Sequence, residues 1–361
     1  MSDYHNQSNE ESDQPILSVR DLKTYFFQDE GVTKAVDGVS FDVYLGKTLG
    51  IVGESGCGKT VAAKSILRIV EKPGRIIKGK ILLKPLNRGN NGNNSVLNEE
   101  YEAIDLTRLD PRGKKIRNIR GSDIAMVFQE PMTSFSPVHT VGNQLIEAIQ
   151  LHQDLSKEDA KQRAIEALHN VEIPRAEGRL NEYPSQLSGG LRQRTMIAMA
   201  LSCDPGILIA DEPTTALDVT TQAQILDLLR KLQQEKRMSI ILITHNMGVI
   251  AEMADDVVVM YLGRVVERGN VEEIFHSPKH PYTKALLKSI PSILVKPRVK
   301  LPTISGSIPH PYNRPKGCTF HPRCSEYMRG VCEKDEPLLK PIGDSQAVSC
   351  FLYHEQEVDK K

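Results

Sequence analysis

The spacing of hydrophobic residues predicts strands at the start of the chain and a strand–loop–helix unit directly after them. Ile16–Phe27 and Lys34–Val43 read as strands. A short apolar run, Thr48–Val52, leads through a glycine-rich loop into Val61–Val70, where apolar residues recur at helical spacing. We therefore expect an antiparallel pair of strands, followed by a strand that runs through a loop into a helix.

The middle of the chain alternates between helical and strand patterns. Gln144–Val171 and Arg192–Ser202 have amphipathic helical spacing and predict a helical subdomain over about residues 130–200. Strand-like and helical segments then follow one another as in the βαβ units of a parallel sheet. These segments are Gly206–Ala210, Gln222–Gln233, Met238–Thr244, Met247–Ala254 and Asp256–Tyr261.

Three further segments lack these patterns. Residues 1–15 are polar and net acidic, and we expect a disordered tail. Lys84–Ser95 is rich in asparagine and predicts a mobile surface excursion. Prolines crowd together beyond Pro291, which predicts a separate loop-rich module. The expected organisation is thus a tail at 1–15, a main domain at 16–287 and a C-terminal module at 288–361.

The composition is that of an ordinary globular protein. Of the 361 residues, 39% are hydrophobic and 25% charged, which excludes a disulfide-stapled miniprotein and a wholly disordered chain. The 46 basic and 46 acidic residues cancel. We interpret the basic run Arg112–Arg120 as a solvated face, and we expect no nucleic-acid partner. Apolar runs are far shorter than the roughly 18 residues of a membrane-spanning helix, and no secretory signal is visible. These features favour a cytoplasmic protein.

Residues 53–60 match the phosphate-loop pattern G-x-x-x-x-G-K-[ST], between the strand and the helix that this motif requires. Glycines let successive N–H groups face a polyphosphate, Lys59 reaches its β and γ groups, and Thr60 offers a hydroxyl to Mg²⁺. A chance glycine turn would not explain the flanking elements, and we interpret Cys57 as a small filler residue. The predicted nucleotide-binding residues are Gly53, Glu54, Ser55, Gly56, Cys57, Gly58, Lys59 and Thr60.

Two carboxylates follow the apolar run Ile207–Ala210, at the carboxyl end of a predicted buried strand. Ligands bind at this edge in open α/β sheets. Asp211 is placed to hold Mg²⁺ through its water shell, and Glu212 to polarise the water that attacks the γ-phosphorus. A merely acidic turn would leave the upstream phosphate loop unexplained.

Two more features concern phosphate binding. Ser188, Gly189 and Gly190 precede a predicted helix and could form a second anion site at its start. His245 follows a strand end, where it could donate a hydrogen bond to a γ-phosphate. A lone histidine there is more often structural, but its position at a second strand edge favours the functional interpretation.

Taken in order, these motifs resemble the ATP-binding subunit of an ATP-binding-cassette (ABC) transporter over about Ile16–Leu287. The resemblance implies an α/β phosphate-loop NTPase with an antiparallel β subdomain, an α-helical subdomain and a small C-terminal module. It also implies ATP and Mg²⁺ as cofactors, and ATP hydrolysis as the activity. Leu191 stands where many members have glutamine. Further sites that the resemblance implies are Gln129 in the glutamine loop, Mg²⁺ ligation by Thr60, Gln129 and Asp211, Asp218 after Ala216-Leu217, and an adenine-stacking aromatic at either Tyr25 or Phe26.

The resemblance also implies partners. In that family two cassettes sandwich two ATP molecules, so that Ser188 would act on the phosphate loop of another subunit. The second cassette is either an identical or, as is common in peptide importers, an unlike ATPase chain. Two membrane permease subunits would contact the glutamine-loop region, and an extracytoplasmic substrate-binding protein would act indirectly. The expected location is the cytoplasmic face of the cell membrane, as a peripheral subunit.

The end of the chain resembles one group within this family, and it also contains a cluster of cysteines. His280-Pro281-Tyr282-Thr283 and residues 317–324 resemble the C-terminal extension of oligopeptide and dipeptide importer ATPases. Of six cysteines, four lie here, at Cys318, Cys324, Cys332 and Cys350. Disulfides are disfavoured in a reducing compartment and zinc by the wide spacing, which favours a 4Fe-4S cluster, with zinc as the alternative. We also expect the module to be independent of nucleotide binding.

Three alternative functions are compatible with parts of this sequence. Within the same importer group the cargo could instead be nickel chelates or short oligosaccharides. A soluble ABC ATPase acting on ribosomes or DNA repair usually has two cassettes or a long coiled-coil insertion, and neither is visible here. A phosphate-loop kinase or GTPase would lack the segment Leu187–Gly190.

Overall fold

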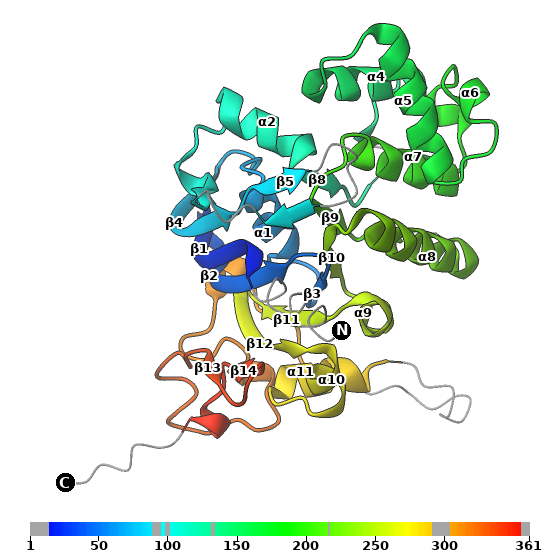
Figure 1. The fold of residues 1–361 in the computed structure, drawn as a ribbon. Coiled ribbons are helices and arrows are strands. Elements are labelled where there is room, and N and C mark those ends of the chain that lie inside the picture. The colour runs from blue at the N-terminus through cyan, green and yellow to red at the C-terminus, as the bar shows by residue number, and fades with distance from the viewer. Residues whose placement is uncertain are drawn as a thin grey trace, which may run out of the picture. The chain divides into compact units, whose positions relative to one another are not determined.

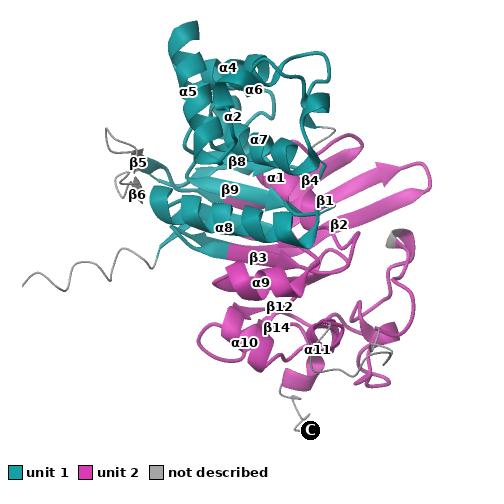
Figure 2. Cartoon of the chain, turned by 90° about the vertical axis from the view of Figure 1, so that its right-hand side faces the viewer, with its two compact units in different colours: residues 1–17, 42–48, 82–242 teal, residues 18–41, 49–81, 243–361 magenta. Residues whose placement is uncertain are grey.

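The computed structural model describes residues 14–88, 95–97, 102–130, 134–215, 217–290 and 304–354 (Figure 1). The chain divides into two compact units, coloured separately in Figure 2. Unit 1 comprises residues 1–17, 42–48 and 82–242, and unit 2 comprises residues 18–41, 49–81 and 243–361. The predicted disordered tail at 1–15 lies outside the described residues up to residue 13. Among the described helices, none has both the length and the apolar character needed to cross a bilayer.

Unit 1 is built on buried parallel strands. Strands β8 (Ile124–Val127) and β9 (Ile207–Asp211) pair in parallel, and β10 (Ser239–Thr244), which begins in this unit, follows β9 in the strand order. Every residue of β9 and β10 is buried. Burial on both faces explains why their sequences are continuous apolar runs rather than alternating patterns.

The helical part of unit 1 differs in detail from the prediction. The segment predicted as helical over Gln144–Val171 forms two helices, because the chain breaks after Gln153 and restarts at Ser156, whose hydroxyl accepts a hydrogen bond from the Asp159 N–H. Among the residues described with full bounds, the helices of this unit are α2 (Lys114–Ser122), α4 (Val141–His152), α5 (Lys157–Asn170), α6 (Ala176–Arg179), α7 (Gly189–Leu201) and α8 (Val219–Lys236), with single 3-10 turns at Leu106–Arg108 and Pro184–Gln186.

The basic run and the asparagine-rich excursion also lie in unit 1. The basic run falls on α2, which buries Ile116 and Ile119 and exposes its lysines, as expected of a solvated face. The segment predicted to be a mobile surface excursion is flanked by two short strands, β5 (Leu86–Arg88) and β6 (Ser95–Leu97), which pair antiparallel with Leu86 opposite Leu97. Residues 89–94 between them lie outside the described residues. Short β7 (Ile104–Asp105) pairs antiparallel with Leu82–Leu83.

Unit 2 contains the phosphate-loop segment and two groups of strands. In one group, β1 (Pro15–Gln28) lies between β2 (Gly31–Tyr44) and β4 (Gly74–Leu83). In the other, β3 (Thr48–Val52) pairs in parallel with β11 (Asp256–Tyr261), which pairs antiparallel with β12 (Arg264–Asn270). The helices are α1 (Lys59–Ile66), α9 (Met247–Met253), α10 (Val271–His276) and α11 (Pro281–Lys288).

The described part of the C-terminal module packs within unit 2. Strand β14 (Ala347–Val348) pairs antiparallel with β12 and with β13 (Lys340–Pro341). Phe320 is 1% exposed, and its ring centroid lies 5.2 Å from those of Tyr261 and Tyr282. The remaining regular segments are single 3-10 turns at Pro311–Asn313, His321–Arg323 and Phe351–Tyr353. The module therefore extends a sheet edge and shares an aromatic cluster with β11 and α11.

Candidate nucleotide-binding site

The phosphate loop in unit 2 needs its glycines because other main-chain segments approach it closely. Gly58 has a φ of +99°, and a Cβ there would lie 2.0 Å from the Ala35 carbonyl oxygen. Gly53 has a φ of +153°, and its Cβ would lie 2.2 Å from the Met260 carbonyl oxygen. Only glycine fits a left-handed backbone under such approach. The loop predicted from residues 53–60 thus has the tightly curled backbone that phosphate binding by N–H groups requires.

The predicted cation of the loop lies against the loop itself. Lys59 is 5% exposed, and its ammonium donates hydrogen bonds to the carbonyl oxygens of Gly53 at 2.7 Å and Glu54 at 3.1 Å. Cys57 is also buried, and burial raises the pKa of its thiol, so it is neutral at pH 7 and fits the filler role. Thr60 follows Lys59 at the start of α1, and Ser55 and Gly56 are exposed.

Two predicted catalytic residues meet in unit 1. Gln129, just beyond β8, donates its amide to a Glu212 carboxylate oxygen at 3.0 Å. The Thr215 hydroxyl donates to the same oxygen at 2.9 Å. Glu212 has a left-handed φ of +47°, whereas Asp211, the last residue of β9, is 1% exposed. The strand end therefore separates a buried carboxylate from an accessible one that is oriented by two hydrogen bonds.

The segment Ser188–Gly190 forms the start of α7, also in unit 1. Ser188 is exposed, and its hydroxyl caps the helix by accepting a hydrogen bond from the Leu191 N–H at 3.4 Å. A Cβ on Gly190 would lie 3.0 Å from the Thr221 methyl group, so this turn lies against the start of α8. Asp218 caps α8 through Thr221, and these hydrogen bonds hold the pKa of Asp218 below its usual value. Ala216 lies outside the described residues.

His245 belongs to unit 2, where it follows β10 and is exposed. The next residue, Asn246, caps α9 by accepting a hydrogen bond from the Gly248 N–H at 2.9 Å. This cap fixes the backbone that carries His245. Its predicted contact with a γ-phosphate stays a prediction.

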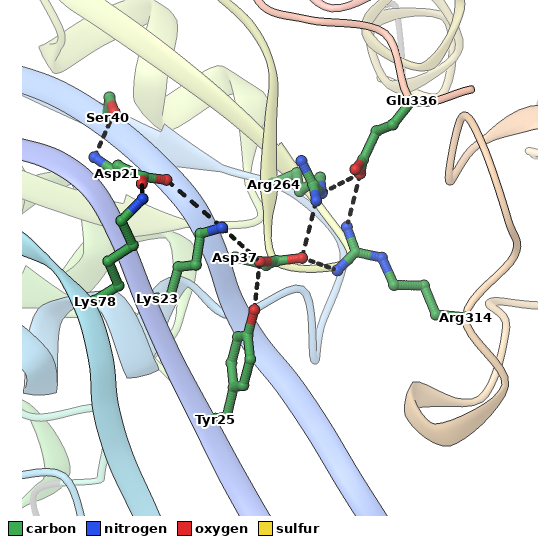
Figure 3. Close-up of polar contacts among 9 residues, drawn as sticks. All are labelled: Asp21, Lys23, Tyr25, Asp37, Ser40, Lys78, Arg264, Arg314 and Glu336. Atoms are coloured by element: carbon green, nitrogen blue, oxygen red, sulfur yellow. Dashed lines mark hydrogen bonds and ion pairs between the residues drawn. The ribbon is translucent and has the colours of Figure 1, made fainter.

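The two candidates for the adenine-stacking aromatic point to different sides of β1. Tyr25 donates its hydroxyl to Asp37 at 2.7 Å, and Arg264 and Arg314 bind the other oxygen of that carboxylate, both at 2.9 Å (Figure 3). Burial and this hydrogen bond raise the pKa of Tyr25 to about 12. Burial alone would raise the pKa of Asp37, but Tyr25 and the two guanidinium groups hold it below its usual value. Phe26 instead lies against Gly74. Tyr25 is thus part of an ion-pair network that includes the C-terminal module.

The sequence did not indicate which residues surround Glu54 of the phosphate loop. Arg323 of the C-terminal module binds both Glu54 oxygens, at 2.7 and 3.0 Å, and also donates to the Tyr261 hydroxyl at 3.3 Å. The Glu54 N–H donates to the Tyr282 hydroxyl at 2.9 Å. Arg323 and Tyr282 lie in the two segments that carry the resemblance to peptide-importer ATPases, residues 317–324 and 280–283. No local sequence pattern predicts such contacts, because they join segments that are far apart in sequence.

The four cysteines of the module are free and lie near one another. Burial raises the pKa of Cys318 to about 12, of Cys350 to about 11, and of Cys324 in the same direction. Cys332 and the other thiols of the cluster add to these shifts. Within the described residues, no group of three or more His, Cys, Asp or Glu side chains is arranged to hold a metal ion. The 4Fe-4S cluster therefore stays a prediction without support from this arrangement.

Comparison with known protein families gives two matches. A family described as ABC transporter matches residues 36–215, and one described as oligopeptide/dipeptide transporter, C-terminal region, matches residues 266–332. The dipeptide transport ATP-binding protein DppD of Escherichia coli is 44% identical over 93% of this chain and 96% of its own length. The oligopeptide transport ATP-binding protein AppD of Bacillus subtilis is 46% identical over 96% of this chain and 99% of its own length.

Solved structures give the same fold. A dimeric, post-hydrolysis ATP-binding cassette bound to ADP and Pi superposes with a TM-score of 0.58 at 26% identity, covering 71% of this chain and 98% of that chain. The cbiO1 subunit from Clostridium perfringens, part of an ABC transporter complex, gives 0.56 at 27% identity, covering 73% and 91%. These similarities confirm the predicted phosphate-loop α/β fold.

Replacing Glu212 by glutamine should block hydrolysis while leaving ATP binding intact. The amide keeps the size and the contact with Gln129 but cannot accept a proton, and a general base contributes at least about 100-fold to a rate. ATP turnover by the assembled transporter and binding of a fluorescent ATP analogue would be measured together. Glu235→Gln, an exposed change on α8, is the matched control. A Glu212→Gln enzyme with wild-type turnover would contradict the assignment.

Replacing Lys59 by alanine should instead weaken ATP binding, by about tenfold or more, because it removes a charged donor at the phosphate loop. Titration of the purified chain with the fluorescent ATP analogue measures this loss of affinity. Lys64→Ala is the control on the same helix, because the ammonium of Lys64 pairs with the exposed carboxylate of Glu71. This substitution should change ATP affinity less than about twofold. Equal affinities for all three proteins would show that Lys59 does not bind phosphate.

Proposed function

Because this chain belongs to the family of ABC transporter ATP-binding subunits, we propose that it is the ATPase that powers a peptide importer. The observation that carries the cargo class is the similarity of the whole chain, C-terminal region included, to proteins named for dipeptide and oligopeptide transport. Hydrolysis of ATP is the activity of this family, and the phosphate loop and the Gln129–Glu212 pair are the parts of this chain that fit it.

The residues divide the chemistry between them. The curled backbone of residues 53–60 would present N–H groups to the phosphates, and Lys59 would leave its carbonyl contacts to bind them. Bound Mg²⁺ would offset phosphate charge, and Thr60, Gln129 and Asp211 are the residues that would hold it. Glu212, oriented by Gln129 and Thr215, would position the attacking water and accept its proton.

The Ser188–Gly190 turn, in which Ser188 and Gly189 are exposed, supports the proposal that the chain works as one of two cassettes. The first turn of a helix, with an exposed serine at its cap, is suited to bind phosphate, because N–H groups at a helix start favour anions. It would complete the nucleotide site of a second ATPase subunit, identical or unlike. Two permease subunits would complete the importer, with this chain at the cytoplasmic face of the membrane and a substrate-binding protein outside.

The isolated chain at low concentration should therefore be a poor ATPase. Its turnover should rise when permease and paired cassette are present, and rise further when a binding protein loaded with a short peptide is added. Turnover would be measured in proteoliposomes with peptide, nickel chelate or oligosaccharide as cargo. Full-rate turnover by the diluted chain would contradict the dependence on partners. Stimulation by nickel chelate or oligosaccharide alone would contradict the peptide cargo.

We also propose that Cys318, Cys324, Cys332 and Cys350 hold a 4Fe-4S cluster with a structural role. The proposal rests on the donor set and not on a preformed metal site: four free thiols lie in the module, and three of them accept hydrogen bonds from backbone N–H groups, those of Phe320, Glu326 and Leu352. Such bonds favour the thiolate form that metals need, but burial outweighs them and raises the pKa of these three thiols, so a cluster would have to stabilise the thiolates itself. Four thiolates so close together would repel one another without a cationic group. A cluster with four irons uses one cysteine per iron, unlike a single-ion site.

Anaerobically purified protein should be brown, with iron and acid-labile sulfide near four each per chain, the stoichiometry of the cluster itself. Cys324→Ser should lower both, whereas Cys203→Ser, a buried cysteine of unit 1, should not. Colourless protein that contains one zinc ion per chain would contradict the 4Fe-4S cluster and favour a zinc site at the same cysteines. Colourless metal-free protein with four alkylatable thiols would exclude both.

A further inference from the structure

Glu54 is a carboxylate inside a loop whose chemistry is to bind phosphate. It follows Gly53, and its main-chain carbonyl accepts a hydrogen bond from Lys59. A negative charge at this position repels a polyphosphate, because two like charges a few ångströms apart interact strongly where water is partly excluded. The phosphate loop therefore carries a residue that opposes its own ligand unless its charge is compensated.

The compensating charge comes from the C-terminal module. The Arg323 side chain is 4% exposed and the Glu54 side chain 22%. Their contact is bidentate, at 2.7 and 3.0 Å, which is the strongest geometry for an arginine–carboxylate pair. Both residues belong to unit 2.

Arg323 is itself held in place from several sides. Its Nε donates to the Ser305 carbonyl oxygen at 3.1 Å, and Nη1 also reaches the Tyr261 hydroxyl. Tyr261 packs against Tyr282, with ring centroids 4.8 Å apart, and Tyr282 accepts the Glu54 N–H. A guanidinium fixed in this way loses little conformational freedom in forming the pair.

Tyr282 is fixed by buried polar contacts of its own. His280 is 1% exposed, and burial lowers its pKa to about 3, so its ring is neutral and Nδ1 accepts the Tyr282 N–H at 3.0 Å. The His280 N–H in turn donates to the buried Glu267 at 2.9 Å. The main chain and the side chain of Glu54 are thus both anchored to the segment beyond residue 260.

We propose that the C-terminal module acts in cis on ATP binding, with Arg323 as a positioning residue that neutralises and holds Glu54 of the phosphate loop. The module is then part of the nucleotide site's support and not only a family-specific appendage. This inference rests on ATP binding by the phosphate loop, and it requires neither peptide cargo nor a metal in the module.

The test is ATP affinity of the full-length chain, measured with a fluorescent ATP analogue. Arg323→Gln leaves Glu54 charged and unpaired, and should weaken binding by about tenfold or more. Arg323→Lys keeps the charge and should recover part of the affinity. Arg329→Gln removes the same charge at an exposed position of the module and should change affinity less than about twofold. Wild-type affinity in Arg323→Gln would overturn the proposal.

A second variant separates charge from loss of structure. Glu54→Gln/Arg323→Gln removes both charges, so it should bind ATP within about threefold of Glu54→Gln alone if repulsion is the cause. A double variant as weak as Arg323→Gln would show that the module has merely unfolded, and would overturn the proposal. In the assembled transporter, Arg323→Gln should raise KM for ATP with kcat at saturation unchanged. A fall in kcat with KM unchanged would also overturn it. Failure of peptide stimulation would leave these readouts unaffected.

Discussion

The close approach of three main-chain segments at the phosphate loop is the constraint on which unit 2 depends. The carbonyl oxygens of Ala35 and Met260 lie where side chains of Gly58 and Gly53 would otherwise project. The Gly263 N–H also donates to the Cys57 carbonyl oxygen at 2.9 Å, and the Gly263 carbonyl accepts the Asp37 N–H at 2.8 Å. A bulkier loop would push these segments apart. The strands that flank the loop can therefore pack only around a glycine-rich sequence.

The C-terminal module is attached to this arrangement by two carboxylates, the buried Asp37 and the partly buried Glu54. Asp37, on β2, is held by Arg314 of the module together with Arg264, and Glu54 is held by Arg323 (Figure 3 shows the first of these networks). A carboxylate removed from water is costly unless it is paired, so each of the two favours the position of the segment that brings its arginine. The expectation that the module is independent of nucleotide binding did not include these contacts. The contact of Arg323 with Glu54 connects the module to the phosphate loop through side chains and does not involve the metal site proposed within the module.

In unit 1, a strand end positions the two carboxylates that we propose to act in hydrolysis. β9 is buried throughout and ends in Asp211, and the left-handed backbone at Glu212 turns the next carboxylate out of the strand direction. Gln129 and Thr215 then fix its orientation. The Ser188 turn remains exposed at the start of α7, as a surface for another molecule requires. An exposed helix start is what the proposed completion of a second subunit's site would require.

The sequence alone determined the features that are local: the strand, loop and helix around residues 53–60, the carboxylates after β9, the serine cap of α7 and the α/β class. Each depends on residues a few positions apart, so periodicity and backbone chemistry are sufficient to predict it. Only the tertiary structure decided which distant residues meet. Gln129 and Glu212 are 83 positions apart, and Glu54 and Arg323 are 269 apart. Such pairs form because the fold brings distant segments of the chain together. No short-range sequence pattern predicts which carboxylate an arginine of the C-terminal module will contact.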